Sequence, residues 1–239
     1  MTPESGIRVS ELLDALGAED RASQRRACEE VIELMREDRG VRDAVVKRMR
    51  DGTPLARFGA AYVLFHDGPS LRPVPALLDS LELDDGDLRW TATHQLVTLG
   101  RTQPEVLPLL LHEVGAGSSA QRRRMAIYAA RELAPEIEET ASALSRALDD
   151  GSADVRLAAL SSVAKLIDPG DALRARVLQV LESDSDPRMR RIAAVVLPDL
   201  YRDDLPGGRR VRDLLQELSP ATDADLGPAA RLALRRLPA

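Results

Sequence analysis

The sequence predicts an all-α protein, an α-solenoid (α-α superhelix) of about seven stacked helical hairpins. Three observations lead to this prediction. A pattern of about 33 residues recurs along nearly the whole chain. Its apolar residues follow the spacing of helices rather than strands. Aromatic residues make up only 3% of the chain, so Leu, Ala and Val must fill the core, as is common in helical proteins.

The repeat is easiest to follow from one reference position near the start of its second helix. An alanine stands three residues after this position in all seven copies, from Ala27 to Ala233, and a small side chain lets helices cross closely. The seventh copy is degenerate, with its reference near Ala230. The other six reference positions, at steps of 32 to 34 residues, are Gln24, Arg57, Arg89, Arg123, Arg156 and Arg190.

Six of the seven second helices carry their own start signal. In these copies the residue four positions before the reference is Asp, Ser or Thr, whose side chain can accept a hydrogen bond from a free N–H of the first helical turn. Pro54 and Pro187 follow two of these residues, at the first helical position, where a missing N–H is harmless. The predicted N-caps are Asp20, Thr53, Asp85, Ser119, Ser152 and Asp186.

A first helix precedes each of these second helices. Pairs of apolar residues four apart, such as Leu12 with Leu16 and Val177 with Leu181, mark one face of a helix. Because one hairpin cannot bury its apolar face alone, we expect neighbours to stack into a single domain, residues 1–239. The predicted repeats are residues 8–38, 39–68, 69–103, 104–136, 137–170, 171–204 and 205–239.

Three segments carry a family resemblance: "MRDGTPLARFGAAYVLF" (49–65), "LDDGSADVRLAALSSVAKL" (148–166) and "LESDSDPRMRRIAAVVLPDL" (181–200). They resemble HEAT repeats, including the short bacterial HEAT-like type of phycobilisome-lyase-like proteins. The chain departs from that pattern at Gln24, which is not Arg, and at Arg122, where other copies have an apolar residue. The resemblance implies a structural ladder in which arginines bind turn aspartates and tie repeats together. Its pairs would be Asp51 with Arg57, Asp150 with Arg156 and Asp184 with Arg190, and Arg89 and Arg123 would extend it.

Five of the six Phe, Trp and Tyr residues gather on one face of three consecutive second helices. A helix turns about 100° per residue, so positions one, five and eight after the reference point away from the core. In HEAT-like solenoids these helices line the concave surface, so the stripe predicts a partner-binding groove. The alternative is that these side chains pack between adjacent second helices. The stripe consists of Phe58, Tyr62, Phe65, Trp90, His94, Arg124, Tyr128 and Arg131.

The sequence shows no catalytic or metal-binding motif. The histidines His66, His94 and His112 lack the i, i+3 or i, i+4 spacing of a helical metal site. The single cysteine, Cys28, falls on a core position and suits a reducing compartment. We therefore expect neither enzymatic activity nor a cofactor or metal.

The net charge and the hydropathy of the chain limit the classes of partner that the sequence predicts. The net charge of -6 argues against a nucleic-acid ligand, although arginines cluster at 122–124, 188–191 and 209–212. A long apolar run and a signal peptide are both missing, so a cytoplasmic protein without a membrane partner is expected. The leading prediction is a scaffold or adaptor that binds a protein or peptide. Two alternatives are a nucleic-acid protein similar to DNA-alkylation-repeat glycosylases and a protein similar to bilin lyases.

Overall fold

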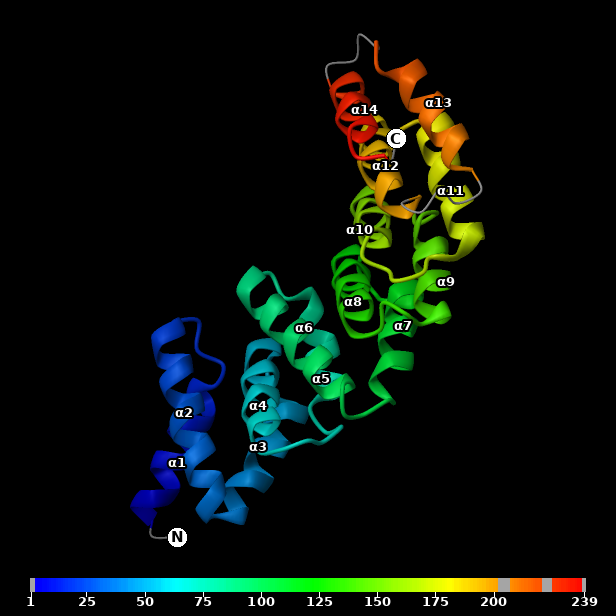
Figure 1. Ribbon diagram of the computed structural model, residues 1–239. Coiled ribbons are helices and arrows are strands. Elements are labelled where there is room, and N and C mark those ends of the chain that lie inside the picture. The colour runs from blue at the N-terminus through cyan, green and yellow to red at the C-terminus, as the bar shows by residue number, and fades with distance from the viewer. Residues whose placement is uncertain (1–2, 202–206, 221–224, 238–239) are drawn as a thin grey trace. The chain divides into compact units, whose positions relative to one another are not determined.

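The computed structural model describes residues 3–201, 207–220 and 225–237 (Figure 1). Within these ranges the chain forms fourteen α-helices and one short 3-10 helix, and it contains no strand. The helices follow one another as antiparallel hairpins, which confirms the predicted all-α solenoid.

The odd-numbered helices are the first members of the hairpins and the even-numbered helices are the second members. The first members are α1 (Pro3–Ala15), α3 (Arg39–Asp51), α5 (Val74–Asp79) with the 3-10 helix η1 (Ser80–Glu82), α7 (Val106–Ala116), α9 (Glu138–Ala147), α11 (Gly170–Ser183) and α13 (Gly208–Leu218). The second members are α2 (Arg21–Glu37), α4 (Pro54–His66), α6 (Gly86–Gly100), α8 (Ala120–Leu133), α10 (Ala153–Val163), α12 (Pro187–Leu200) and α14 (Leu226–Leu234).

The predicted N-caps begin six of the seven second helices. In five of them the cap side chain accepts a hydrogen bond from a backbone N–H of the first turn, as Asp20 does from Ser23 and Thr53 from Ala56. Ser152 occupies the cap position of α10 without such a bond. Local side-chain chemistry therefore determines where these helices begin.

The repeated alanine lies at the closest packing of the helices. All seven copies of this residue, from Ala27 to Ala233, are buried to 2% exposure or less. The apolar residues that end the first helices are buried with them, for example Leu16, Leu81 and Leu181. Small side chains at these positions let each second helix approach its neighbours closely.

The helices group into two compact units, residues 1–110 and 111–239. In the first unit α2 packs beside α4, and α4 beside α6. In the second, α8, α10, α12 and α14 form a similar row (Figure 1). The assignment of residues 1–239 to one domain and the repeat limits remain predictions, and the limit between 204 and 205 lies outside the described residues.

None of the described helices combines the length and the apolar character that crossing a membrane requires.

Candidate functional site

The six reference side chains share one structural task. Each donates a hydrogen bond to a backbone carbonyl at the end of the preceding first helix or in the turn that follows it. Arg57 Nε reaches the oxygen of Met49 at 3.1 Å, and Arg190 Nε reaches that of Leu181 at 3.0 Å. The other four donate in the same way, namely Gln24, Arg89, Arg123 and Arg156. Carbonyls at a helix C-terminus lack intrahelical partners, so these side chains satisfy them.

Gln24 shows why this position tolerates a residue other than arginine. Its Nε2 donates to the carbonyl of Leu16 at 2.9 Å, and the side chain is buried. The amide thus reproduces the backbone contact of the arginines without a charge.

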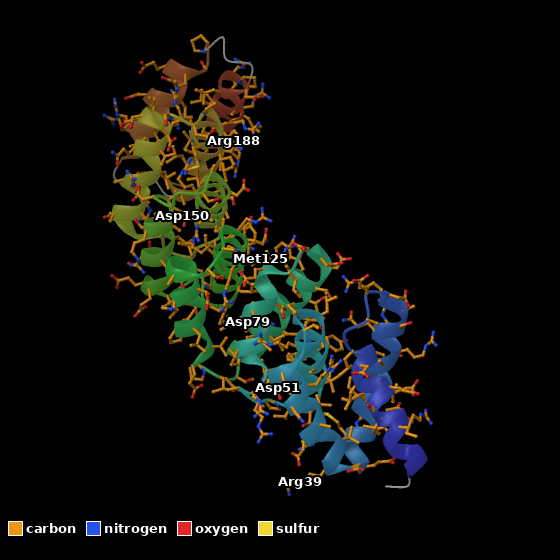
Figure 2. The ribbon with its side chains drawn as sticks, turned by 180° about the vertical axis from the view of Figure 1, so that it is seen from behind. Arg39, Asp51, Asp79, Met125, Asp150 and Arg188 are labelled. Atoms are coloured by element: carbon orange, nitrogen blue, oxygen red, sulfur yellow. The ribbon has the colours of Figure 1, made fainter. Side chains whose placement is uncertain are left out.

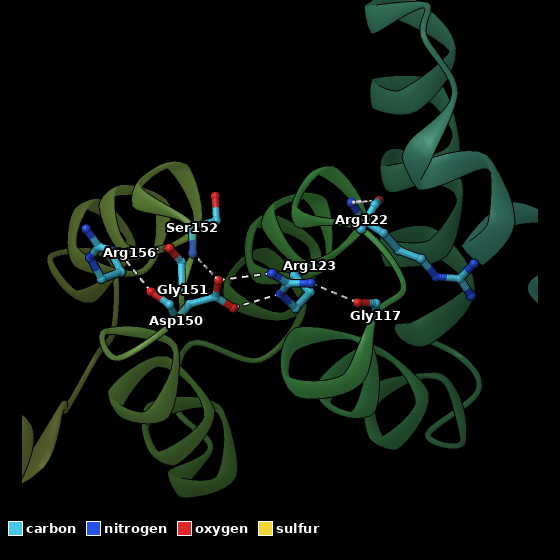
Figure 3. A network of polar contacts seen from close by, with 8 residues as sticks. Gly117, Arg122, Arg123, Asp150, Gly151, Ser152 and Arg156 are labelled. Atoms are coloured by element: carbon cyan, nitrogen blue, oxygen red, sulfur yellow. Dashed lines mark hydrogen bonds and ion pairs between the residues drawn. The ribbon is translucent and has the colours of Figure 1, made fainter.

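The arginine–aspartate contacts differ from the expected pairs. Arg123 binds the carboxylate of Asp150 with two hydrogen bonds, and the Asp150 carboxylate also accepts the backbone N–H of Ser152 (Figure 3). Arg156, the expected partner of Asp150, instead donates to the backbone oxygens of Asp150 and Gly151 (Figure 3). The carboxylate therefore belongs to the arginine of the preceding repeat.

The other two expected pairs are also wrong. Asp51, labelled in Figure 2, binds the neighbouring Arg50, while Arg57 pairs with Asp79 on α5. The Asp184 carboxylate accepts the backbone N–H of Asp186 rather than binding Arg190. Arg57 and Arg123 thus reach a carboxylate in the following repeat and only the backbone of their own turn.

Arg122, which departs from the HEAT pattern, forms a second clamp. Its Nε and Nη2 lie 2.6 and 2.8 Å from the two carboxylate oxygens of Glu113, and both side chains are largely buried. This ion pair replaces an apolar contact between α7 and α8 and accounts for the departure.

The aromatic stripe divides between the two compact units. In residues 1–110, Phe58, Tyr62 and His66 succeed one another along α4. Their ring centroids lie 6.3 Å apart between Phe58 and Tyr62 and 4.6 Å apart between Tyr62 and His66. Phe58 is only 4% exposed, whereas Tyr62 and Phe65 are half-buried. For Phe58, the expectation of an exposed groove residue is wrong, because it packs between neighbouring second helices.

The remaining stripe residues are more accessible. Trp90 on α6 is 53% exposed, and His94, one turn later, is exposed too. In residues 111–239, the guanidinium of Arg131 lies 5.5 Å from the ring centroid of Tyr128, a cation–π contact, and both side chains are half-buried. Arg124 is half-buried as well. Their role in binding a partner remains a prediction.

A pocket of about 580 Å³ lies over the aromatic residues of α4. We call it the α2–α4–α6 pocket, after the three second helices that enclose it. Phe58, Tyr62 and His66 are its contribution from α4. Its other lining residues are Arg21, Gln24, Arg25, Cys28, Glu29 and Ile32 from α2, and Asp87, Leu88 and Thr91 from α6.

An ion pair joins the two helices that flank the pocket. Arg21, at the start of α2, binds the carboxylate of Asp85, the N-cap of α6. The hydrogen bond from Arg21 holds the pKa of Asp85 below its ordinary value. Arg21 also contacts the side-chain oxygen of Gln24 at 3.4 Å, so both terminal nitrogens of its guanidinium have a partner.

Two titratable groups of the pocket are neutral at pH 7. Burial lowers the pKa of His66 below its ordinary value of 6.5. Burial, reinforced by the nearby charge of Glu29, raises the pKa of the Cys28 thiol to about 12. A thiol that stays protonated is a poor nucleophile, so Cys28 acts as a small lining residue.

The sequence pattern did not predict three lining residues of α2, although their positions in the repeat could have identified them. Arg25, Glu29 and Ile32 stand one, five and eight residues after Gln24, the same positions that define the aromatic stripe. A search guided by aromatic side chains passes over them because none is aromatic.

Several arginines toward the C-terminal end are paired with carboxylates. This pairing supports a solvated, charge-compensated surface rather than an anion site. The pairs are Arg188 with Asp186, Arg191 with Asp225, Arg210 with Glu182 and Arg236 with Asp199. In the part of the chain that the structure describes, no three His, Cys, Asp or Glu side chains gather as a metal site would require.

No protein-family model matches the chain, and no curated protein matches it in sequence. Solved structures match its fold. YibA of E. coli, a HEAT-like repeat protein, aligns over 99% of this chain and 98% of its own at 16% identity, with a TM-score of 0.52. This likeness confirms the HEAT-like solenoid fold.

Two weaker matches complete the comparison. A designed armadillo repeat protein, solved in complex with the peptide (KR)4, aligns over 96% of this chain and 99% of its own at 15% identity, with a TM-score of 0.48. The complex of CpcE and CpcF of phycocyanin lyase from Nostoc aligns over 96% of this chain and 94% of its own at 17% identity, with a TM-score of 0.35.

Proposed function

We propose that the chain is a non-catalytic scaffold that binds a segment of a protein partner along its second helices. The α2–α4–α6 pocket is the anchoring point of this surface. Its aromatic floor carries the proposal, because aromatic side chains in a hollow are typical anchors of protein interfaces, and Tyr62 is half-buried there between Phe58 and His66.

The second helices of the other unit offer a similar surface. A hollow of about 510 Å³ lies among α10, α12 and α14, lined mainly by apolar side chains such as Ile192, Val195 and Leu232. Leu232 is 52% exposed. Hollows on the second helices of both units support a role for these helices in binding.

The chemistry of the pocket supports binding rather than catalysis. Its thiol is protonated and its imidazole is neutral, and its acidic and basic side chains belong to two helices held together by the Arg21–Asp85 ion pair. A nucleic-acid partner is a weaker alternative, because Arg188, Arg210 and Arg236 are each paired with a carboxylate. A DNA shift assay at low salt tests that alternative directly.

A matched pair of threonines on α6 tests the proposal. Thr91 lines the pocket and Thr98 does not, yet each hydroxyl donates to the carbonyl four residues earlier, at 2.8 and 2.9 Å. Thr91→Phe fills the pocket, whereas Thr98→Phe adds the same bulk elsewhere on the helix. Random peptides selected by display on the full chain should bind the Thr98→Phe variant and lose binding to Thr91→Phe. Equal binding to both variants would overturn the proposal.

A further inference from the structure

We propose that the α2–α4–α6 pocket selects a basic side chain, arginine or lysine, from the bound segment. The inference rests on the proposed function and names the chemistry of the partner at that site. It stands on the floor of the pocket, on the charges of its walls and on the charge of the surrounding unit.

The floor offers aromatic faces without a competing charge. Tyr62 is half-buried between Phe58 and His66, with ring centroids 6.3 and 4.6 Å away. A guanidinium or ammonium group placed over such a ring is attracted by its negative face. The aliphatic stem of the same side chain packs on Ile32 and Leu88, which also line the pocket.

The walls carry two carboxylates that are free to receive a cation. Glu29 stands on α2 and Asp87 on α6, and both are exposed. Among the residues that the structure describes, none forms an ion pair with either carboxylate. They lie on opposite walls, so a basic side chain entering between them would be approached by a carboxylate from each side.

Of the two arginines in the lining, only Arg25 has an unpaired positive charge that would repel a basic side chain. Arg21 is already neutralised by Asp85. Arg25 is exposed and forms no ion pair with a described residue. The lining holds two arginines and two carboxylates. Because Asp85, just outside the lining, neutralises Arg21, two carboxylates remain against one guanidinium, a net charge of -1.

The surrounding unit has the same sign. Residues 1–110 contain 14 Arg and Lys against 19 Asp and Glu, a net charge of -5, whereas residues 111–239 carry only -1. The turn before α6 adds Asp84, three residues before Asp87. Such a field attracts a basic segment and repels an acidic one.

The test compares short fluorescein-labelled peptides in which serine alternates with arginine, lysine or glutamate. Their binding to the full chain is followed by fluorescence anisotropy at low and at physiological salt. We expect the arginine and lysine peptides to bind, more weakly as salt rises, and the glutamate peptide not to bind. Equal binding of the glutamate peptide, or failure of both basic peptides to bind at the highest soluble concentration, would overturn the inference.

Three substitutions of charged lining residues test whether binding of the basic peptides changes in the expected direction. Glu29→Gln and Asp87→Asn should each weaken binding of the basic peptides about two- to fivefold, as expected for partly exposed charge pairs. Arg25→Gln should strengthen binding, because it removes the opposing cation. Glu33→Gln, on the same helix but outside the lining, is the matched control and should change little. Weaker binding by Arg25→Gln would contradict the inference.

This result can be separated from the proposed function. If display selects peptides that Thr91→Phe excludes but that show no enrichment in arginine or lysine, the binding scaffold stands and the basic preference falls. If Thr91→Phe leaves selected peptides bound, the scaffold proposal itself fails.

Discussion

Arg123 holds Asp150 across the boundary between two repeats. The bonds run from Nε to Oδ2 at 2.7 Å and from Nη2 to Oδ1 at 3.0 Å, a forked geometry that matches a guanidinium to a carboxylate. The same guanidinium donates to the carbonyl of Gly117 at 3.0 Å (Figure 3). One side chain thus completes the end of its own hairpin and links it to the next.

Removing the Arg123 side chain should destabilise the fold. Arg123→Ala leaves the carboxylate of Asp150 and the carbonyl of Gly117 without these partners, and both ends of the ion pair are largely buried, with side chains 20% and 12% exposed. We expect a loss of about 1–3 kcal/mol in the free energy of unfolding, measured by urea denaturation. Arg50→Ala is the control, since the Arg50–Asp51 pair is exposed and lies within one turn. Equal losses in the two variants would contradict a special role for the inter-repeat pair.

The same pair should give the stability a distinct pH dependence. The hydrogen bonds from Arg123 hold the pKa of Asp150 below its ordinary value of 3.8. Because the folded-state pKa is the lower one, the stabilisation is fully present above about pH 5 and is lost as pH falls through the folded-state pKa. The melting temperature of Asp150→Asn should therefore lie below that of the wild type at neutral pH, and the difference should shrink in acid. A difference that is constant with pH would show that the charge of Asp150 does not matter.

A glycine in α4 marks the closest approach between two hairpins. A Cβ added to Gly59 would lie 2.3 Å from the carbonyl oxygen of Leu16, so one of the two backbones would have to move. Gly59→Ala should destabilise the protein by about 1–3 kcal/mol, as overpacking does. Gly115, also within a helix, has open space around its Cβ position, and Gly115→Ala should instead stabilise by up to about 1 kcal/mol. Thermal unfolding of both variants measures whether the melting temperature falls or rises. A Gly59→Ala variant as stable as the wild type would contradict the close approach.

Local signals explain what the sequence could predict. Cap residues such as Asp20 and Thr53, the repeated alanine and the apolar residues four apart each act within one hairpin, and the structure confirms the helices they predict. At the reference position, the side chains contact the backbone of their own hairpins, although the expected carboxylate pairs are wrong. Gln24, which breaks the arginine pattern, keeps the backbone contact that the pattern serves.

Contacts between hairpins explain what it could not predict. Asp150 lies six residues before Arg156 and 27 residues after Arg123, and only the stacking of repeats brings the distant residue closer. The α2–α4–α6 pocket depends on the same stacking, because its lining comes from three hairpins. Helical phase placed Phe58 and Tyr62 on one face, but whether a side chain on that face is buried depends on the neighbouring helices.

Truncation to alanine should cost much more stability at one member of the aromatic stripe, Phe58, than at another, Trp90. Phe58 is 4% exposed and Trp90 is 53% exposed. Phe58→Ala should destabilise the protein by about 3–5 kcal/mol, the usual loss for a buried phenylalanine. Trp90→Ala should change the free energy of unfolding by less than about 1 kcal/mol, as surface substitutions do.

Because Trp90 is the single tryptophan of the chain, its fluorescence checks the same assignment in the unmodified protein. We expect red-shifted emission and strong quenching by acrylamide in the folded state, since half of the side chain is in contact with water. Phe58→Ala tests whether this signal reports only on Trp90: under conditions where that variant remains folded, its emission should match the wild type. Blue-shifted, protected emission from the wild type would place Trp90 in a packed interface and remove it from the accessible part of the stripe.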